Sequence, residues 1–313
     1  MDTDQSPQVR QAIAALKSFR DGESGIDRAV ACGRQAVPAL RQVLFEREPS
    51  GLYQARCRAI DALAALRAHE VLIEFLAADR TIADPIERVG EDAAINAAAL
   101  ALAKTRDERV FALLLRLASR ACLTGVIGAL GAYRSAAAIP ALIDALEEDA
   151  SRLTAEGALK KLGKRARAAL LRTASRRLPS DEQESESSAR RRRSALRLLA
   201  EIGIPRRDWE PLRPLLQDPD PKAAMLACRI CFARGTAADW RVAARSLIDL
   251  LGHEDWTLRE NAETCLIENF AKARQAIDAF LCTCRPRGDG GSERTASTLR
   301  RLITRTQAVA DAG

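Results

Sequence analysis

The chain has 313 residues, of which 47% are hydrophobic and only 4% aromatic, and Ala and Leu dominate the hydrophobic set. This composition favours closely packed helices and predicts almost no β-structure. No segment approaches the roughly 18 consecutive apolar residues of a membrane span. The first residues are polar and acidic, unlike a secretory signal, so we expect a cytoplasmic protein whose eight cysteines are reduced thiols.

The net charge of +7 is unevenly distributed along the chain. Residues 1–150 hold 18 Lys and Arg against 21 Asp and Glu, whereas residues 151–313 hold 31 against 21. The basic C-terminal half is therefore expected to face an acidic protein segment, nucleic acid or an anionic surface.

A repeated pattern begins after residues 1–26, which we expect to form a polar N-terminal cap. The pattern is an apolar helix, usually with a proline at its start, that ends in a leucine. Four such leucines are Leu44, Leu146, Leu216 and Leu251, and they lie 102, 70 and 35 residues apart. These separations are multiples of about 34 to 35 residues, which indicates an array of similar units. Segments 71–76 and 110–115 have the apolar spacing of two further first helices.

A second helix in each unit is predicted to end at a glycine. The glycines are Gly131, Gly163, Gly203 and Gly235, at intervals of 32, 40 and 32 residues. Glycine takes the left-handed conformation that closes a helix at low cost. The long interval contains residues 178–188, whose polar and acidic composition predicts a disordered loop between the two helices of one pair.

The turn between the two helices of a pair also has a recurrent chemistry. Aspartates in these turns are suited to accept the free N–H groups at the start of the second helix, and prolines end the preceding helix. A basic residue then follows early in the second helix, at Arg152, Lys222 and Arg259.

This order of features resembles HEAT repeats, particularly those of the bacterial phycobilisome-lyase type. The resemblance is clear over about residues 27–66 and 136–281. It implies an all-α fold, an α-solenoid of about eight antiparallel helix pairs that forms a single array over residues 1–313, with the second helices lining a concave surface. Residues 285–292 are predicted to be a flexible linker, followed by a C-terminal helix at 293–310.

The strongest local charge feature is the run Arg190, Arg191, Arg192 and Arg193. Four consecutive residues of a helix point in different directions, so some of these arginines are predicted to be available to carboxylates or phosphates. The alternative is a solvated helix start that the preceding Asp181, Glu182, Glu184 and Glu186 neutralise. Arg152, Lys222 and Arg259 are further candidates for a basic ladder along the inner helices, although such residues also pair with aspartates of the turns.

All three tryptophans follow an aspartate, at Trp209, Trp240 and Trp256. The HEAT-like alkylpurine DNA glycosylases hold a damaged base with Trp and Asp, which makes these residues candidates for partner binding. Each pair also lies at a helix start or a turn, where the aspartate serves as an N-cap and the tryptophan packs on the neighbouring repeat.

No catalytic or metal-binding pattern is complete. His69 and His253 each precede a glutamate, as in the iron-binding HEAT-repeat hydroxylases, but two such dipeptides are fewer than that family uses. Cys228 and Cys231 have C-x-x-C spacing on one face of a predicted helix, where both are expected to be core residues. The glycines around Lys164 do not have phosphate-loop spacing. We therefore expect no catalytic residues, no cofactor and no metal.

The sequence thus predicts a non-enzymatic scaffold or adaptor that binds a protein or peptide on the concave face of the array, with an acidic segment favoured. One alternative is a nucleic-acid-binding solenoid, similar to the DNA glycosylases, that uses the basic C-terminal half. A second alternative is a helper similar to the phycobilisome lyases, which attach or remove a prosthetic group. The oligomeric state is left open.

Overall fold

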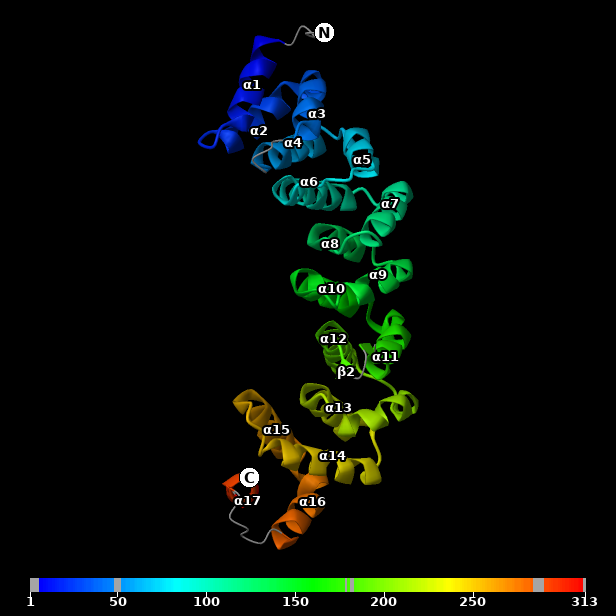
Figure 1. Ribbon diagram of the computed structural model, residues 1–313, viewed down its shortest axis with the longest axis vertical. Helices are drawn as coiled ribbons and strands as arrows, with labels where there is room; N and C mark the ends of the chain where they lie inside the picture. The colour runs from blue at the N-terminus through cyan, green and yellow to red at the C-terminus, as the bar shows by residue number, and fades with distance from the viewer. Residues whose placement is uncertain (1–5, 48–51, 178, 181–182, 284–289, 312–313) are drawn as a thin grey trace. The chain divides into compact units, whose positions relative to one another are not determined.

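The computed structural model describes residues 6–47, 52–177, 179–180, 183–283 and 290–311. Helices account for most of these residues, and the described strands form one antiparallel pair of two residues each (Figure 1). The chain divides into two compact units, Met1–Leu162 and Gly163–Gly313, which we name unit 1 and unit 2. Each unit is a stack of helix pairs, so the predicted all-α solenoid class is confirmed.

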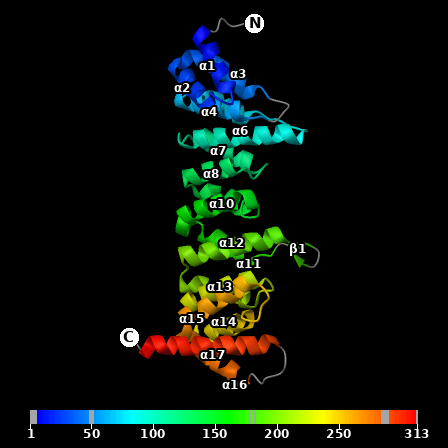
Figure 2. The same ribbon diagram turned by 90° about the vertical axis from the view of Figure 1, so that its left-hand side faces the viewer.

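Unit 1 contains five helix pairs, α1/α2, α3/α4, α5/α6, α7/α8 and α9/α10. The second helices α2, α4, α6, α8 and α10 pack on one another in that order, and Figures 1 and 2 show them side by side. The helices of unit 1, with their short 3-10 segments (η), are α1 (Pro7–Lys17), α2 (Gly22–Ala31), η1 (Gly33–Ala36), α3 (Val37–Phe45), α4 (Gln54–Ala65), α5 (His69–Ala77), α6 (Pro85–Ala103), α7 (Glu108–Ala118), α8 (Thr124–Tyr133), η2 (Ala136–Ala138), α9 (Ile139–Asp144) and α10 (Asp149–Leu162).

Unit 2 contains four pairs, α11/α12, η5/α13, α14/α15 and α16/α17. One first helix is a 3-10 helix, because Pro214 lies inside η5 and cannot donate an α-helical hydrogen bond. The elements of unit 2 are η3 (Gly163–Arg165), α11 (Arg167–Ser175), β1 (Pro179–Ser180), β2 (Gln183–Glu184), α12 (Glu186–Ile202), η4 (Arg206–Asp208), η5 (Glu210–Gln217), α13 (Pro221–Arg234), α14 (Ala237–Leu250), α15 (Trp256–Glu268), α16 (Phe270–Thr283) and α17 (Gly290–Asp311).

The two ends of the chain carry more regular structure than the sequence pattern predicts. The expected N-terminal cap, residues 1–26, holds α1 and the first half of α2, which is one reason why nine pairs are found against about eight predicted. Val9, Ala12 and Leu16 of α1 are buried, so this pair shares the core of unit 1. At the other end, α17 includes the predicted helix 293–310 and residues 290–292 of the predicted linker, whose residues 285–289 lie outside the described part of the chain.

Three of the four predicted glycine stops, Gly163, Gly203 and Gly235, are confirmed as helix ends, and two of these three have a positive φ. Gly163 and Gly203 have φ values of 57° and 77°, in the left-handed region, directly after α10 and α12. Gly131 instead lies within α8, and Arg134 takes the left-handed conformation after that helix. Gly235 follows α13 with a φ of −73°.

The segment predicted as a disordered acidic loop, 178–188, is structured where it is described. Pro179 pairs with Glu184 and Ser180 with Gln183 across β1 and β2. Ser185 caps α12 by accepting the N–H of Ser188. Residues 178, 181 and 182 lie outside the described residues.

Candidate functional site

Arg192 of α12 is fully buried. Its Nε donates to the carbonyl oxygen of Ala174 at 3.0 Å, and its terminal nitrogens donate to the carboxylates of Glu184 and Asp218. A guanidinium in the interior requires such partners, because an unpaired buried charge is strongly destabilising. Arg192 therefore joins three segments of unit 2 and has no exposed surface for a partner.

The other three arginines of the predicted partner-binding run are also buried or partly buried. Arg191 is only 8% exposed, and Arg190 and Arg193 are partly buried. Arg193 donates from Nε to Asp220 at 2.6 Å and pairs with Glu186 at 3.1 Å. The predicted partner-binding run is thus mainly a structural cluster between α12 and α13. The sequence indicated pairing with Glu184 and Glu186, but it did not reveal the contact of Arg192 with Asp218, which lies 26 residues away.

A similar arrangement in unit 1 was missed by sequence reasoning. Arg56 of α4 is 4% exposed. Its Nε donates to the carbonyl oxygen of Leu44 at 2.8 Å, and its terminal nitrogen contacts Glu91 of α6 at 2.7 Å. Arg80 also pairs with Glu91 and lies over the ring of Phe75. The available signal was an arginine 12 residues after a helix-ending leucine, at the start of the second helix.

The predicted basic ladder forms contacts within and between turns. Arg152 lies 3.4 Å from Asp149, and Lys222 lies 3.7 Å from Asp255 in the next turn. Arg259 donates to the carbonyl oxygens of His253 and Glu254, each at 2.8 Å. Arg152 therefore pairs with the preceding aspartate, as the structural alternative predicts, whereas Lys222 contacts an aspartate of the following turn and Arg259 contacts backbone carbonyls.

The three tryptophans do not form one surface. Trp209 is 3% exposed, and its indole N–H donates to Asp239 at 3.0 Å. Trp240 is partly buried, with the Lys272 ammonium 4.9 Å from its ring centroid. Trp256 is 64% exposed at the start of α15. Only Trp256 therefore offers its ring to a partner.

Asp239 is the acceptor at the centre of a second buried cluster. Burial alone would raise the pKa of Asp239, but hydrogen bonds from the Thr236 backbone, Arg213, the Thr236 hydroxyl and Trp209 outweigh it and lower the pKa to about 2. The Thr236 and Asp239 side chains also form a capping box at the start of α14. This cluster stabilises unit 2.

The histidines and the C-x-x-C cysteines have local roles. His69 begins α5, and Nδ1 of His253 accepts the N–H of Asp255 at 3.0 Å. Cys228 and Cys231 are buried in α13, where burial raises the pKa of both thiols, that of Cys231 to about 12. Among the described residues, no group of three or more His, Cys, Asp and Glu side chains is arranged to hold a metal ion.

An exposed apolar surface runs along α6 in unit 1. Most surface helices turn a polar face to solvent, but Ile86, Val89 and Leu100 of α6 are 59%, 61% and 49% exposed. Ala93 and Ala97 lie between them and are partly exposed. These five residues follow helical spacings of three and four positions, and we name them the α6 stripe. Exposed apolar residues that gather on one face are typical of an interaction surface.

A broad groove adjoins the C-terminal half of the α6 stripe. It has a volume of about 890 Å³. Small side chains of α4 and α6 form much of its lining, and three charged residues lie beside them. The lining residues are Asp61, Ala64, Ala65, Arg67, His69, Ala97, Leu100, Ala101, Lys104 and Thr105. Burial raises the pKa of Asp61, and nearby Glu23 adds to this effect while Lys104 opposes it.

The same surface continues over α8 and α10. A Cβ atom placed on Gly128 of α8 would lie 3.4 Å from Leu100 and 3.5 Å from Thr154, which puts this glycine between the stripe and α10. Leu153 of α10 is 69% exposed. The second helices α4, α6, α8 and α10, which Figure 2 shows side by side, therefore carry small and apolar side chains along this part of unit 1.

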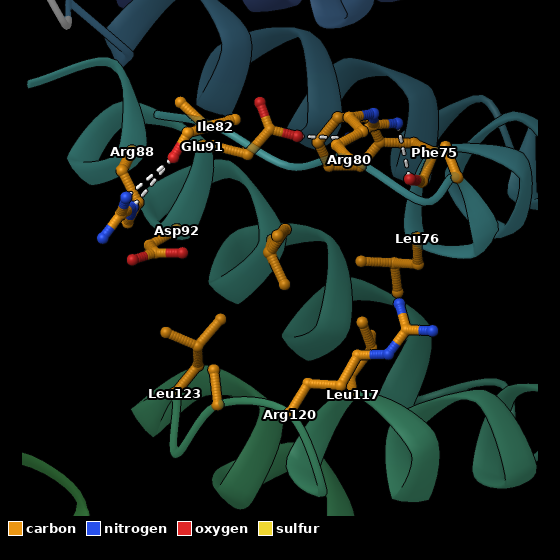
Figure 3. Close-up of a pocket in the computed structure, with 13 residues that line it drawn as sticks. Phe75, Leu76, Arg80, Ile82, Arg88, Glu91, Asp92, Leu117, Arg120 and Leu123 are labelled. Carbon is orange, nitrogen blue, oxygen red and sulfur yellow. Dashed lines mark hydrogen bonds and ion pairs between the residues drawn. The ribbon is translucent and has the colours of Figure 1, made fainter. Parts of the chain in front are cut away.

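A smaller cavity lies against the N-terminal half of α6, on the side away from the stripe. Its volume is about 190 Å³. The α5–α6 connection, α6 and the α7–α8 connection enclose it (Figure 3). Apolar side chains form much of its wall, and arginines and carboxylates lie around them. The lining residues are Phe75, Leu76, Ala78, Arg80, Ile82, Arg88, Glu91, Asp92, Ile95, Leu117, Arg120, Ala121 and Leu123.

None of the helices among the described residues is both long enough and apolar enough to cross a lipid bilayer.

Comparisons with known proteins return structures but no family. No family model matches the chain, and no curated protein matches it. An engineered protein of known structure is 17% identical, with 98% of this chain and 92% of that chain covered and a TM-score of 0.37. The CpcE–CpcF complex of phycocyanin lyase from Nostoc sp. PCC7120 is 21% identical, with 84% and 98% covered and a TM-score of 0.33.

A designed armadillo repeat protein in complex with the peptide (KR)4 is 18% identical to the chain. The match covers 84% of this chain and 100% of that chain, with a TM-score of 0.29. None of these similarities carries a conclusion about function.

Proposed function

We propose that this HEAT/armadillo-like helical-repeat chain is a non-enzymatic scaffold that binds a protein or peptide partner on the second-helix surface of unit 1. The observation that supports the proposal most strongly is the α6 stripe, whose three large apolar residues are about half exposed or more. Exposing such residues to water is unfavourable, and contiguous exposed apolar surface on a protein usually marks a site of association.

The groove beside the stripe favours an extended or helical segment over a flat protein surface. Much of its lining consists of alanines of α4 and α6, so the backbone of a partner can approach both helices closely. Leu100 and Leu153 provide apolar contacts farther along the same surface. A partner segment with apolar side chains at helical or extended spacing can bury them against the apolar residues of this surface.

Nucleic acid is less well supported than a protein partner. Two arginines of the run that suggested phosphate binding, Arg192 and Arg193, form ion pairs with carboxylates of unit 2. These carboxylates are Glu184, Glu186, Asp218 and Asp220. The charged residues of the groove in unit 1 are Asp61, Arg67 and Lys104, so a carboxylate that repels a phosphate backbone lies among two cations that attract it.

The proposal is tested by capturing partners on the tagged full chain from nuclease-treated extract of the native cells. The variant is Leu100→Asp combined with Leu153→Asp, which places charges on the proposed surface. The matched control is Gln42→Asp on α3, an exposed position of a first helix. We expect a defined protein partner to be reduced about tenfold or more by the double variant, since desolvating a carboxylate at an apolar interface is unfavourable, and to be unchanged by the control.

Equal recovery of every captured protein on all three chains would contradict the proposal. Recovery of nucleic acid alone from untreated extract would favour the nucleic-acid alternative.

A further inference from the structure

The small cavity beside α6 contains the carboxylate of Asp92, which has no protein hydrogen-bond donor among the described residues. Asp92 is partly buried, and no hydrogen bond or ion pair is found for it among the described residues, although it lines the cavity. Burial raises the pKa of Asp92, Arg88 opposes this effect and Glu91 adds to it. A partly exposed carboxylate in such a position is hydrated, and it is free to accept a hydrogen bond from a ligand in place of water.

The arginines that line the same cavity already donate hydrogen bonds to other groups of the protein. Arg80 donates to Glu91 and to the carbonyl oxygen of Phe75. Arg88 donates to the carbonyl oxygen of Ile82 at 2.8 Å, and Arg120 to Asp79 at 2.9 Å. In Figure 3, Arg88 and Asp92 lie at one end of the cavity, and Arg120 extends toward Leu76 at the other end.

These contacts define what the cavity is suited to hold. The positive charge of Arg88 lies near Asp92, so the local charge is nearly balanced and attracts a further cation only weakly. The carboxylate of Asp92 has no hydrogen-bond donor among the described residues, and a neutral N–H group of a ligand can replace the water that otherwise bonds to it. The apolar walls, among them Leu76, Ile95 and Leu117, favour an apolar side chain beside that N–H.

We propose that this cavity, which we name the Asp92 pocket, takes one apolar side chain of the protein or peptide partner, while the partner's backbone N–H donates a hydrogen bond to Asp92. The inference rests on the proposed function, because it assumes a polypeptide partner. It adds a second contact on the opposite side of α6 from the α6 stripe.

The test uses a displayed library of random 12-residue peptides selected on the immobilised full chain. Selected peptides are synthesised with a fluorescent label, and their affinities are measured by fluorescence anisotropy. Three variants probe the pocket: Asp92→Ala removes the acceptor, Asp92→Asn keeps a neutral acceptor oxygen, and Ala121→Phe fills the cavity. The matched control is Ala137→Phe, an exposed alanine of η2 elsewhere in unit 1. Circular dichroism and thermal unfolding check that each variant folds.

The proposal predicts selected peptides with a shared apolar residue, whose affinity falls about tenfold with Asp92→Ala and with Ala121→Phe. Asp92→Asn is expected to keep the affinity within about threefold, and Ala137→Phe to leave it unchanged.

Three other results would overturn the inference in distinguishable ways. Peptides that are insensitive to both Asp92→Ala and Ala121→Phe but are lost with Leu100→Asp would remove the pocket and leave the proposed function standing. An equal loss with Asp92→Asn and Asp92→Ala would show that a cation, not a neutral N–H, contacts the carboxylate. Selection of no binding peptide would count against both the pocket and the peptide-binding proposal.

Discussion

Individual residues show where sequence patterns mislead about function. Four consecutive arginines look like a binding surface, yet Arg192 is the largest fully buried side chain in the described part of the chain. The burial arises because Glu184 lies before α12, Asp218 lies after η5, and the fold brings both to one guanidinium. Such convergence depends on tertiary structure, and a charge run alone does not predict it.

Replacing Arg192 with alanine is expected to destabilise unit 2 by about 3 to 5 kcal/mol, because Asp218 stays buried and loses one of its ionic partners, while Arg177 remains. Urea unfolding followed by circular dichroism measures the change. Arg172→Ala, at an exposed position of α11, serves as the control and should change stability by less than about 0.5 kcal/mol. An equally small effect for Arg192→Ala would contradict the structural role.

Asp239 is expected to make the stability of unit 2 sensitive to acid. Its pKa is lowered from 3.8 to about 2 on folding, so its contribution is present above pH 4 and is lost as the pH falls from about 4 toward about 2. Asp239→Asn should therefore cost about 2 kcal/mol at pH 7 and progressively less below about pH 4. Unfolding free energies of both proteins across this pH range measure the difference, and a constant difference would argue against the shift.

The buried thiols are expected to be much less reactive than Cys282. Burial raises the pKa of Cys231 and Cys265 to about 12 each, whereas Cys282 is exposed. Since the thiolate is the reactive form, iodoacetamide at pH 8 should modify Cys282 before Cys231 and Cys265 in the folded chain. Peptide mass spectrometry at timed intervals identifies the order, and early modification of Cys231 would contradict the described packing.

At the scale of single elements, α6 and α8 place the candidate site. Segment 85–103 has apolar residues on both faces of the helix, which is one feature of a helix with an exposed apolar surface. A segment rich in alanine is equally typical of a fully buried helix, so the sequence does not distinguish the two. The close approach of α8 to its neighbours was similarly hidden. Gly131, predicted as a helix stop, is needed instead because a Cβ atom there would lie 2.6 Å from that of Ala158.

Two glycines of α8 are expected to respond oppositely to alanine. Gly131→Ala forces α8 and α10 apart and should destabilise unit 1 by about 1 to 3 kcal/mol. Gly128→Ala makes only ordinary contacts and should stabilise the helix by about 0.5 to 1 kcal/mol. Thermal unfolding compares the two, and a loss of stability from Gly128→Ala as large as that from Gly131→Ala would count against the described helix spacing.

At the scale of the whole molecule, the fold was accessible from sequence and the candidate site was not. Regularly spaced helix-ending leucines and turn aspartates identify the solenoid class, and the apolar spacing of residues 71–76 and 110–115 identifies the first helices α5 and α7. The candidate site instead depends on which side of each second helix stays uncovered. That property follows from the packing of α4, α6, α8 and α10 together, and one helix alone does not reveal it.

The central claim is that the second-helix surface of unit 1 holds a polypeptide partner. The most direct measurement places a photo-crosslinking amino acid at Ala65, Ala101 or Leu153, and at Gln42 of α3 as the control, in the full chain exposed to nuclease-treated native extract. The account predicts the same crosslinked protein from all three surface positions and none from Gln42. Crosslinks that form equally at Gln42, or only to nucleic acid when nuclease is omitted, would contradict it.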